Sequence, residues 1–212
     1  IEERENVRKK SSADFHDEAG NKITKISLLT ELAKREVNGK EDLKEYLDKI
    51  EENTKELSTG MRDFIWVLDP AKDSLWDTIN RIKDFGLSMF EYTETNFTVS
   101  GLNENHKNTQ LSMDYRRALV LIFKEAINNV AKYAAAENVT LELNTSGGEI
   151  KLVLSDDGRG FDPDSNGDGY GLSNMKERAG KIGGNLIIKS DFSKGTSITF
   201  LSKITNKNKT YE

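Results

Sequence analysis

The 212-residue chain contains no cysteine, which excludes disulfide bonds, thiolate catalysis and cysteine-based metal sites. It has two histidines, His16 and His106, too few for a multi-histidine metal site. No apolar run approaches the ~18 residues that cross a bilayer. The 31 basic and 36 acidic residues leave a net charge of −5, which argues against a nucleic-acid-binding protein. The remaining classes are proteins that act through polar side chains and small ligands.

The N-terminal part has the periodicity of two long helices. Apolar residues recur at three- and four-residue steps from Phe15 to Val37, and Asn38-Gly39 ends this helix. A second stretch steps regularly by four and three residues, a heptad seam that ends before Pro70. The seam consists of Leu43, Leu47, Ile50, Thr54, Leu57, Met61, Phe64 and Leu68. The pattern predicts a helical hairpin.

One hairpin cannot bury both of its apolar stripes. Two hairpins packed as a four-helix bundle can, which predicts a homodimer. The alternative is a hairpin that lies on the second domain of its own chain.

The second half mixes helical and strand patterns. We expect helices at 73–92, 114–136 and 171–182, and strands at 96–101, 138–144, 149–155, 184–190 and 196–202. The predicted class is α+β, with an N-terminal helical hairpin followed by an α/β sandwich. The expected domains are 1–70 and 71–205, followed by a disordered tail at 206–212. His106 lies in a polar stretch and is expected at the surface.

A polar stripe marks the long helix predicted at 114–136. Glu125, Asn129 and Lys132 stand at i, i+4 and i+7, on one face. A solvated surface would explain the acid and the lysine, but asparagine is a poor residue in the middle of a helix. A carboxylate, a carboxamide and an ammonium group together suit Mg²⁺ and phosphates, with Glu125 and Asn129 as metal ligands.

Glycine-rich turns follow. The strand at 149–155 runs into Asp156-Asp157-Gly158-Arg159-Gly160, where a carboxylate behind a flexible turn can accept a hydrogen bond from an amino group such as that of adenine. A calcium-binding loop or an ordinary acidic turn would have a similar sequence pattern. Gly169-Tyr170-Gly171-Leu172 opens a helix whose free N–H groups can meet phosphate oxygens. Lys194-Gly195-Thr196 leads into the last strand with a hydroxyl group.

In order and spacing, these motifs resemble the N, G1, G2 and G3 boxes of the histidine kinase-like ATPase superfamily, which has the Bergerat nucleotide-binding fold. The resemblance implies that ATP and Mg²⁺ are the cofactors. It implies that Asn129 binds magnesium, that Glu125 is the N-box acid and that Asp156 accepts a hydrogen bond from the adenine amino group. The other implied nucleotide-binding residues are Lys132, Tyr133, Gly158, Gly160, Gly169, Gly171, Leu172 and Thr196. Tyr133 stands where the family usually has histidine, so this position offers a hydroxyl group that can form hydrogen bonds but cannot carry a positive charge.

The stretch from Asp14 to Asn21 resembles the H box of bacterial sensor kinases of the third dimerisation and phosphoacceptor subfamily. The resemblance implies that His16 is the phosphoacceptor. Asp17, beside it, can accept the imidazole proton. Asn21 occupies the place of a family glutamine that positions a water molecule for phosphatase activity; it has the same amide with one methylene less.

We therefore expect the cytoplasmic core of a sensor histidine kinase, an autokinase that passes phosphate to an aspartate of a response regulator. The chain begins at Ile1 without methionine, so we expect a fragment of a longer protein, with no membrane insertion of its own. One alternative is a non-catalytic dimeric module that binds ATP. Another is an ATPase or serine kinase of the same superfamily with an unrelated hairpin. A purely structural coiled coil would leave the glycine motifs unexplained.

Overall fold

The computed structural model describes residues 22, 25–26, 28–29, 32–33, 40–162 and 170–203. The chain divides into two compact units, Ile1–Leu68 and Asp69–Glu212. The candidate residues His16, Asp17, Asn21 and Gly169, and the tail predicted at 206–212, lie outside the described residues. Within the described part, no helix combines the length and the apolar character needed to cross a membrane.

Helix α2 (Lys40–Leu68) contains the whole predicted heptad seam. It ends where the sequence predicts, because Pro70 disfavours a helical residue before it and the Asp69 carboxylate caps the next turn. That carboxylate accepts a hydrogen bond from the Ala71 N–H at 2.9 Å, at the start of the short 3₁₀ helix η1 (Pro70–Lys72).

The seam is incompletely buried within a single chain. Leu47 and Met61, which lie two heptads apart along the seam, are 52% and 42% exposed. Large apolar side chains in a regular row are unusual on a surface that faces only water. The row suits packing against a second copy, and the four-helix bundle remains a prediction.

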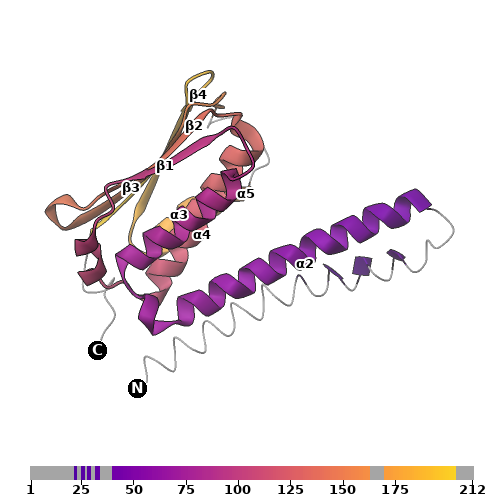
Figure 1. Cartoon of the computed structure of the whole chain (residues 1–212), viewed down its shortest axis with the longest axis horizontal. Coiled ribbons are helices and arrows are strands. Elements are labelled where there is room, and N and C mark those ends of the chain that lie inside the picture. Colours follow the sequence, from indigo (N-terminus) through magenta and orange to yellow (C-terminus); the bar gives the residue numbers. More distant parts are fainter. Residues whose placement is uncertain are drawn as a thin grey trace. The chain divides into compact units, whose positions relative to one another are not determined.

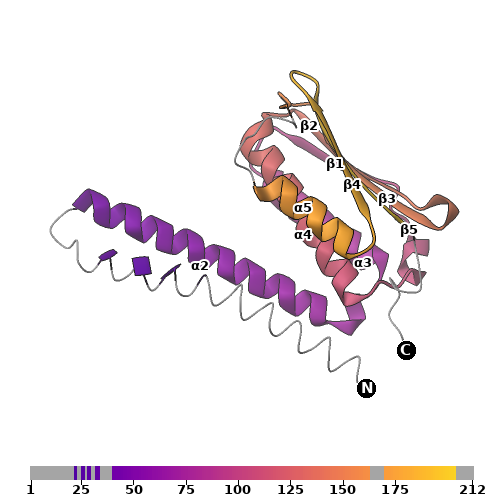
Figure 2. The same cartoon turned by 180° about the vertical axis from the view of Figure 1, so that it is seen from behind.

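The second unit is built on a five-stranded sheet (Figure 1; Figure 2). The strands are β1 (Asn96–Ser100), β2 (Asn138–Asn144), β3 (Glu149–Asp156), β4 (Asn185–Asp191) and β5 (Gly195–Lys203). Their spatial order is β1-β2-β3-β5-β4; β1 pairs with β2 in parallel, and the other pairs are antiparallel. The central strands therefore bring the end of β3 beside the start of β5, which is where the site lies.

Three helices, α3 (Leu75–Phe90), α4 (Met113–Asn129) and α5 (Tyr170–Lys181), cover one face of the sheet (Figure 1). Alternate strand residues point into the core between the layers, because side chains in a strand alternate between its two faces. They include Val139, Leu141, Leu143, Ile150, Leu152, Leu154, Ile198 and Phe200. The predicted α+β class with an α/β sandwich is confirmed. In the second unit, the helices predicted at 73–92 and 171–182 and all five predicted strands begin and end within two residues of their expected places.

The end of the central helix differs from the predicted continuous α-helix. After α4 the backbone makes one π-helical turn, Val130–Ala134, and Ala135 then adopts a left-handed conformation with φ of 50°. A π turn takes more residues than an α turn, so the side chains that follow face in new directions. This turn decides which of Lys132 and Tyr133 reaches the site.

The predicted surface position of His106 is wrong. His106 belongs to the short 3₁₀ helix η2 (Glu104–Asn108) and is 5% exposed. Its Nδ1 accepts a hydrogen bond from the Asn103 N–H at 3.1 Å, and its Nε2 lies 3.0 Å from Thr145 Oγ1. Burial lowers the pKa of the His106 imidazole. The polar neighbours suggested exposure, but partners from two segments satisfy both ring nitrogens, so the ring can be buried.

Candidate functional site

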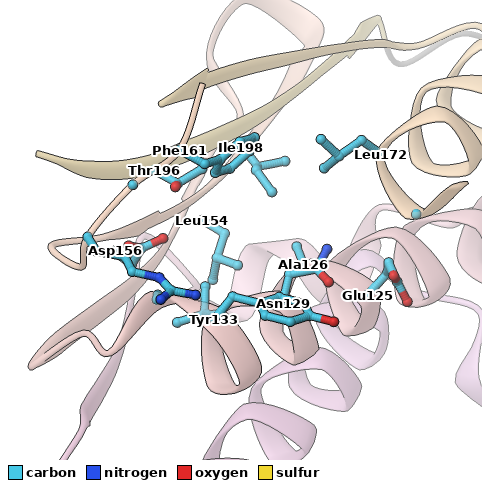
Figure 3. Close-up of a pocket in the computed structure, with 15 residues that line it drawn as sticks. Glu125, Ala126, Asn129, Tyr133, Leu154, Asp156, Phe161, Leu172, Thr196 and Ile198 are labelled. Atoms are coloured by element: carbon cyan, nitrogen blue, oxygen red, sulfur yellow. The ribbon is translucent and has the colours of Figure 1, made fainter. Parts of the chain in front are cut away.

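A cavity of about 500 Å³ lies between α4, α5 and the adjoining ends of β3 and β5 (Figure 3). Its walls combine apolar side chains with a few polar groups, as small-molecule sites commonly do. The lining residues are Glu125, Ala126, Asn129, Val130, Tyr133, Ala134, Leu154, Asp156, Arg159, Gly160, Phe161, Gly171, Leu172, Thr196 and Ile198. Most of the predicted nucleotide-binding residues thus meet around one space, although they come from four separate segments.

Helix α4 and its π turn supply Glu125, Asn129 and Tyr133, each four residues after the one before. The predicted third member of the polar stripe, Lys132, is exposed and does not line the cavity. The π turn explains the difference, since it places the next residue, Tyr133, on the cavity side. The structure brings Glu125 and Asn129 together, and it leaves Lys132 outside.

Asp156 ends β3 at one end of the cavity and is partly buried. Its Oδ1 accepts a hydrogen bond from the Gly158 N–H at 2.9 Å. Burial raises the pKa of the Asp156 carboxyl, and backbone hydrogen bonds from Gly158 and Thr196 oppose this only in part. A desolvated carboxylate that faces a cavity is a strong acceptor for an amino group of a ligand.

The neighbouring Asp157 has a structural task. Its Oδ1 accepts hydrogen bonds from the backbone N–H groups of Glu137 and Asn138, both at 2.9 Å, and its Oδ2 accepts one from Asn138 Nδ2 at 2.8 Å. Hydrogen bonding from Asn138 lowers the pKa of the Asp157 carboxyl. Asp157 therefore secures the start of β2 and points away from the cavity that Asp156 faces.

The glycines of this turn permit close backbone contacts. A Cβ on Gly158 would lie 2.3 Å from the Ala134 carbonyl oxygen, so Gly158 supports the cavity from behind without lining it. Gly160 has a φ of 61°, and a Cβ there would lie 2.0 Å from the Asp191 carbonyl oxygen. Only glycine lets this loop pack against both the π turn and the turn after β4.

The start of α5 closes the opposite end of the cavity, where Leu172 and Glu125 appear in Figure 3. A Cβ on Gly171 would lie 2.6 Å from Glu125 Oε1. The absence of a side chain at Gly171 therefore lets the first turn of α5 approach the polar groups of α4. A helix start carries unpaired N–H groups and a partial positive charge, which favours anions.

Hydroxyl groups join the last strand to the loop after Asp156. Thr196 Oγ1 lies 2.9 Å from Ser190 Oγ, which also accepts a hydrogen bond from the Phe161 N–H at 2.9 Å. Thr196 thus lines the cavity and holds the segment that carries Phe161. Sequence reasoning missed Arg159, Phe161, Leu154 and Ile198 as lining residues, although each stands within three residues of a predicted site residue.

Family comparisons identify the two parts of the chain. Residues 8–73 match a family described as histidine kinase, and residues 114–206 match the family of histidine kinase-, DNA gyrase B-, and HSP90-like ATPases. The chain belongs to the histidine kinases. The second match implies that this histidine kinase binds ATP, which agrees with the cavity lining.

Curated relatives include the signal transduction histidine-protein kinase/phosphatase UhpB of Salmonella typhimurium, 29% identical over 89% of this chain and 37% of its own length. The kinase/phosphatase DegS of Brevibacillus brevis is 24% identical over 98% of this chain and 54% of its own. The sensor histidine kinase LiaS of Bacillus subtilis is 26% identical over 90% of this chain and 52% of its own length. The chain therefore spans about half of these relatives' length or less.

Solved structures share the fold. The histidine kinase domain of the blue-light activated kinase EL346 of Erythrobacter litoralis superposes with a TM-score of 0.59 at 13% identity, covering 89% of this chain and 96% of that domain. The histidine kinase AdeS of Acinetobacter baumannii superposes with a TM-score of 0.57 at 14% identity, covering 86% of this chain and 96% of the AdeS chain.

Proposed function

We propose that this chain is a cytoplasmic autokinase core that uses ATP to phosphorylate His16 and then passes the phosphoryl group to an aspartate of a response-regulator receiver domain. It acts as a homodimer, in which residues 1–70 supply His16 and the bundle, and residues 71–205 bind the nucleotide. The observation that carries the proposal is the single cavity that is lined by Glu125, Asn129 and Asp156 together with the first turn of α5.

The two ends of the cavity suit the two ends of ATP. The partly buried Asp156 carboxylate and the apolar side chains of Leu154 and Ile198 suit a flat base with an amino group. The start of α5 and the polar groups of Glu125 and Asn129 suit phosphates.

The residues present also fit Mg²⁺. Glu125 and Asn129 offer a carboxylate and a carboxamide oxygen one helical turn apart, on the cavity wall. The described residues contain no cluster of three acidic or histidine side chains that would form a complete metal site. A magnesium site commonly takes one or two protein oxygens and completes its shell with phosphates and water. When bound, Mg²⁺ would neutralise charge on the phosphates.

The phosphoacceptor chemistry needs a neutral imidazole, and a histidine with the ordinary pKa of ~6.5 is mostly neutral at pH 7. A ring nitrogen of His16 attacks the γ-phosphorus, the bond from that phosphorus to the ADP oxygen breaks, and Asp17 takes or stabilises the proton of the other ring nitrogen.

Transfer of label from γ-labelled ATP tests the proposal. The wild-type chain should acquire an acid-labile, alkali-stable phosphate that His16→Gln abolishes, and Asn129→Asp should abolish it without unfolding the protein. Nucleotide binding without any label would favour the non-catalytic module, which the replacement of the family histidine by Tyr133 could produce. Acid-stable label would favour a serine kinase and contradict the proposal.

Mixing His16→Gln protein with Asn129→Asp protein tests how the dimer works. Label in the mixture, absent from either variant alone, requires one subunit to phosphorylate the other. Failure to regain label after subunit exchange would restrict the reaction to a single subunit.

Phosphatase activity is the second activity that the relatives UhpB and DegS carry in their names. We propose that Asn21 limits it here, because its amide reaches less far than glutamine toward a water molecule beside the regulator's phosphate. Asn21→Gln should extend the amide by about 1 Å, enough to affect in-line attack. Decay of a phosphorylated regulator should then be faster with the variant, at unchanged autokinase activity. Equal decay rates would show that reach at this position does not limit the reaction.

A further inference from the structure

We propose that Arg159 is a nucleobase-binding residue whose guanidinium group lies against the adenine ring at the Asp156 end of the cavity. The inference rests on the proposed function, since it concerns the same ATP site, and it assigns a ligand contact to a residue that is not among the predicted nucleotide-binding residues. Arg159 stands between the two glycines of the loop, and its side chain lines the cavity.

The backbone of Arg159 is fixed on both sides. Its N–H donates a hydrogen bond to the Ala134 carbonyl oxygen at 2.8 Å, and its carbonyl oxygen accepts one from the Ser193 N–H at 2.7 Å. The flanking glycines, Gly158 and Gly160, have no room for a side chain. The side chain of Arg159 therefore starts from a well-defined point at the rim of the cavity.

Arg159 is also the basic residue of this site. Among the described residues that line the cavity, it is the only one with a positive charge. Its side chain is exposed, and within the described part of the chain no hydrogen bond or ion pair engages its guanidinium group. The group is thus available to a ligand without first breaking another contact.

Its attachment places Arg159 at the base end of the cavity. The hydrogen bond to Ala134 joins it to the residue beside Tyr133, and Figure 3 shows Tyr133 and Asp156 toward one end of the cavity, with Glu125 and Leu172 toward the other. A planar guanidinium group stacks on aromatic rings and binds their faces through cation–π attraction. The phosphates, at the start of α5, lie at the other end.

The experiment compares ATP, ADP and adenosine as competitors of a fluorescent ATP analogue bound to the full chain. Arg159→Ala should weaken all three by the same factor, about tenfold, and Arg159→Lys should recover part of the loss. The matched control is Lys194→Ala, which removes the same charge from the adjoining turn, where Lys194 is exposed and paired with Asp191. It should leave all three affinities unchanged.

Two outcomes overturn the inference. A loss that grows from adenosine to ADP to ATP would make Arg159 a phosphate contact, and unchanged affinities would remove it from the site. The wild-type chain separates the two proposals, because failure of the wild type to bind ATP refutes the proposed function itself. Thermal midpoints of the variants, expected to equal that of the wild type, exclude unfolding as the cause of a loss.

Discussion

Glu125 and Gly171 meet across the cavity so closely that a Cβ on Gly171 would lie 2.6 Å from Glu125 Oε1 and 3.9 Å from Asn129 Nδ2. The glycine is therefore needed for space, at a point where two helices bring a carboxylate and a helix start together. The contact joins two motifs that stand more than forty residues apart in the sequence.

Gly171→Ala tests this contact. The methyl group should displace either the Glu125 carboxylate or the first turn of α5, and affinity for MgATP should fall by at least about tenfold, because small misplacements in a site are costly. Gly180→Ala is the matched control, since it lies on the same helix with nothing within 4 Å of the added Cβ. Equal affinities for the two variants, measured by nucleotide titration, would contradict the finding.

Asp156→Asn should separate function from stability. Loss of the charged acceptor should weaken ATP binding by about ten- to a hundredfold. The pKa of Asp156 is raised by burial, so in the native state the ionised form is disfavoured and the wild type loses stability as the pH rises through that pKa. The variant should therefore melt at a higher temperature than wild type at pH 7, with the gain shrinking toward pH 4. A lower midpoint at pH 7 would refute this account.

Asp157→Ala, at the next position, should lower stability and leave ATP binding unchanged. The variant loses three hydrogen bonds that hold Glu137 and Asn138, with a cost in unfolding free energy of about 1 kcal/mol because the carboxylate is exposed. The pKa of Asp157 is lowered in the folded state, so its contribution is present at neutral pH and lost as the pH falls below its ordinary value near 4. ATP affinity should stay at the wild-type value. A large loss of affinity would place Asp157 in the site.

Leu47→Asp combined with Met61→Asp should dissociate the predicted dimer. Both side chains are exposed in the single chain, so the changes leave the fold intact, whereas burying two charges in a bundle costs several kcal/mol. Leu87→Asp, at an exposed leucine of α3, should leave the oligomeric state unchanged. Light scattering checks the masses, and a dimer that survives the double change would show that the seam is not the interface.

Local patterns were sufficient to predict the elements of the fold. Helix α2 follows from heptad steps, and β2 and β3 follow from alternating apolar residues around a glycine turn, because these periods reflect backbone geometry within one segment. The order of the glycine motifs likewise indicated a nucleotide site that includes Asp156 and Asn129. Each of these predictions depends on residues close together in the chain.

What only the tertiary structure decided is the direction of individual side chains. Adjacent acids, Asp156 and Asp157, diverge because one faces the cavity and the other meets the backbone that leads into β2. A π turn takes Lys132 out of the site, and Thr145, from the loop after β2, lets His106 be buried. Sequence periodicity reports which face of an element is apolar, but the partners that satisfy or orient a polar group come from distant segments, and only the folded chain brings them together.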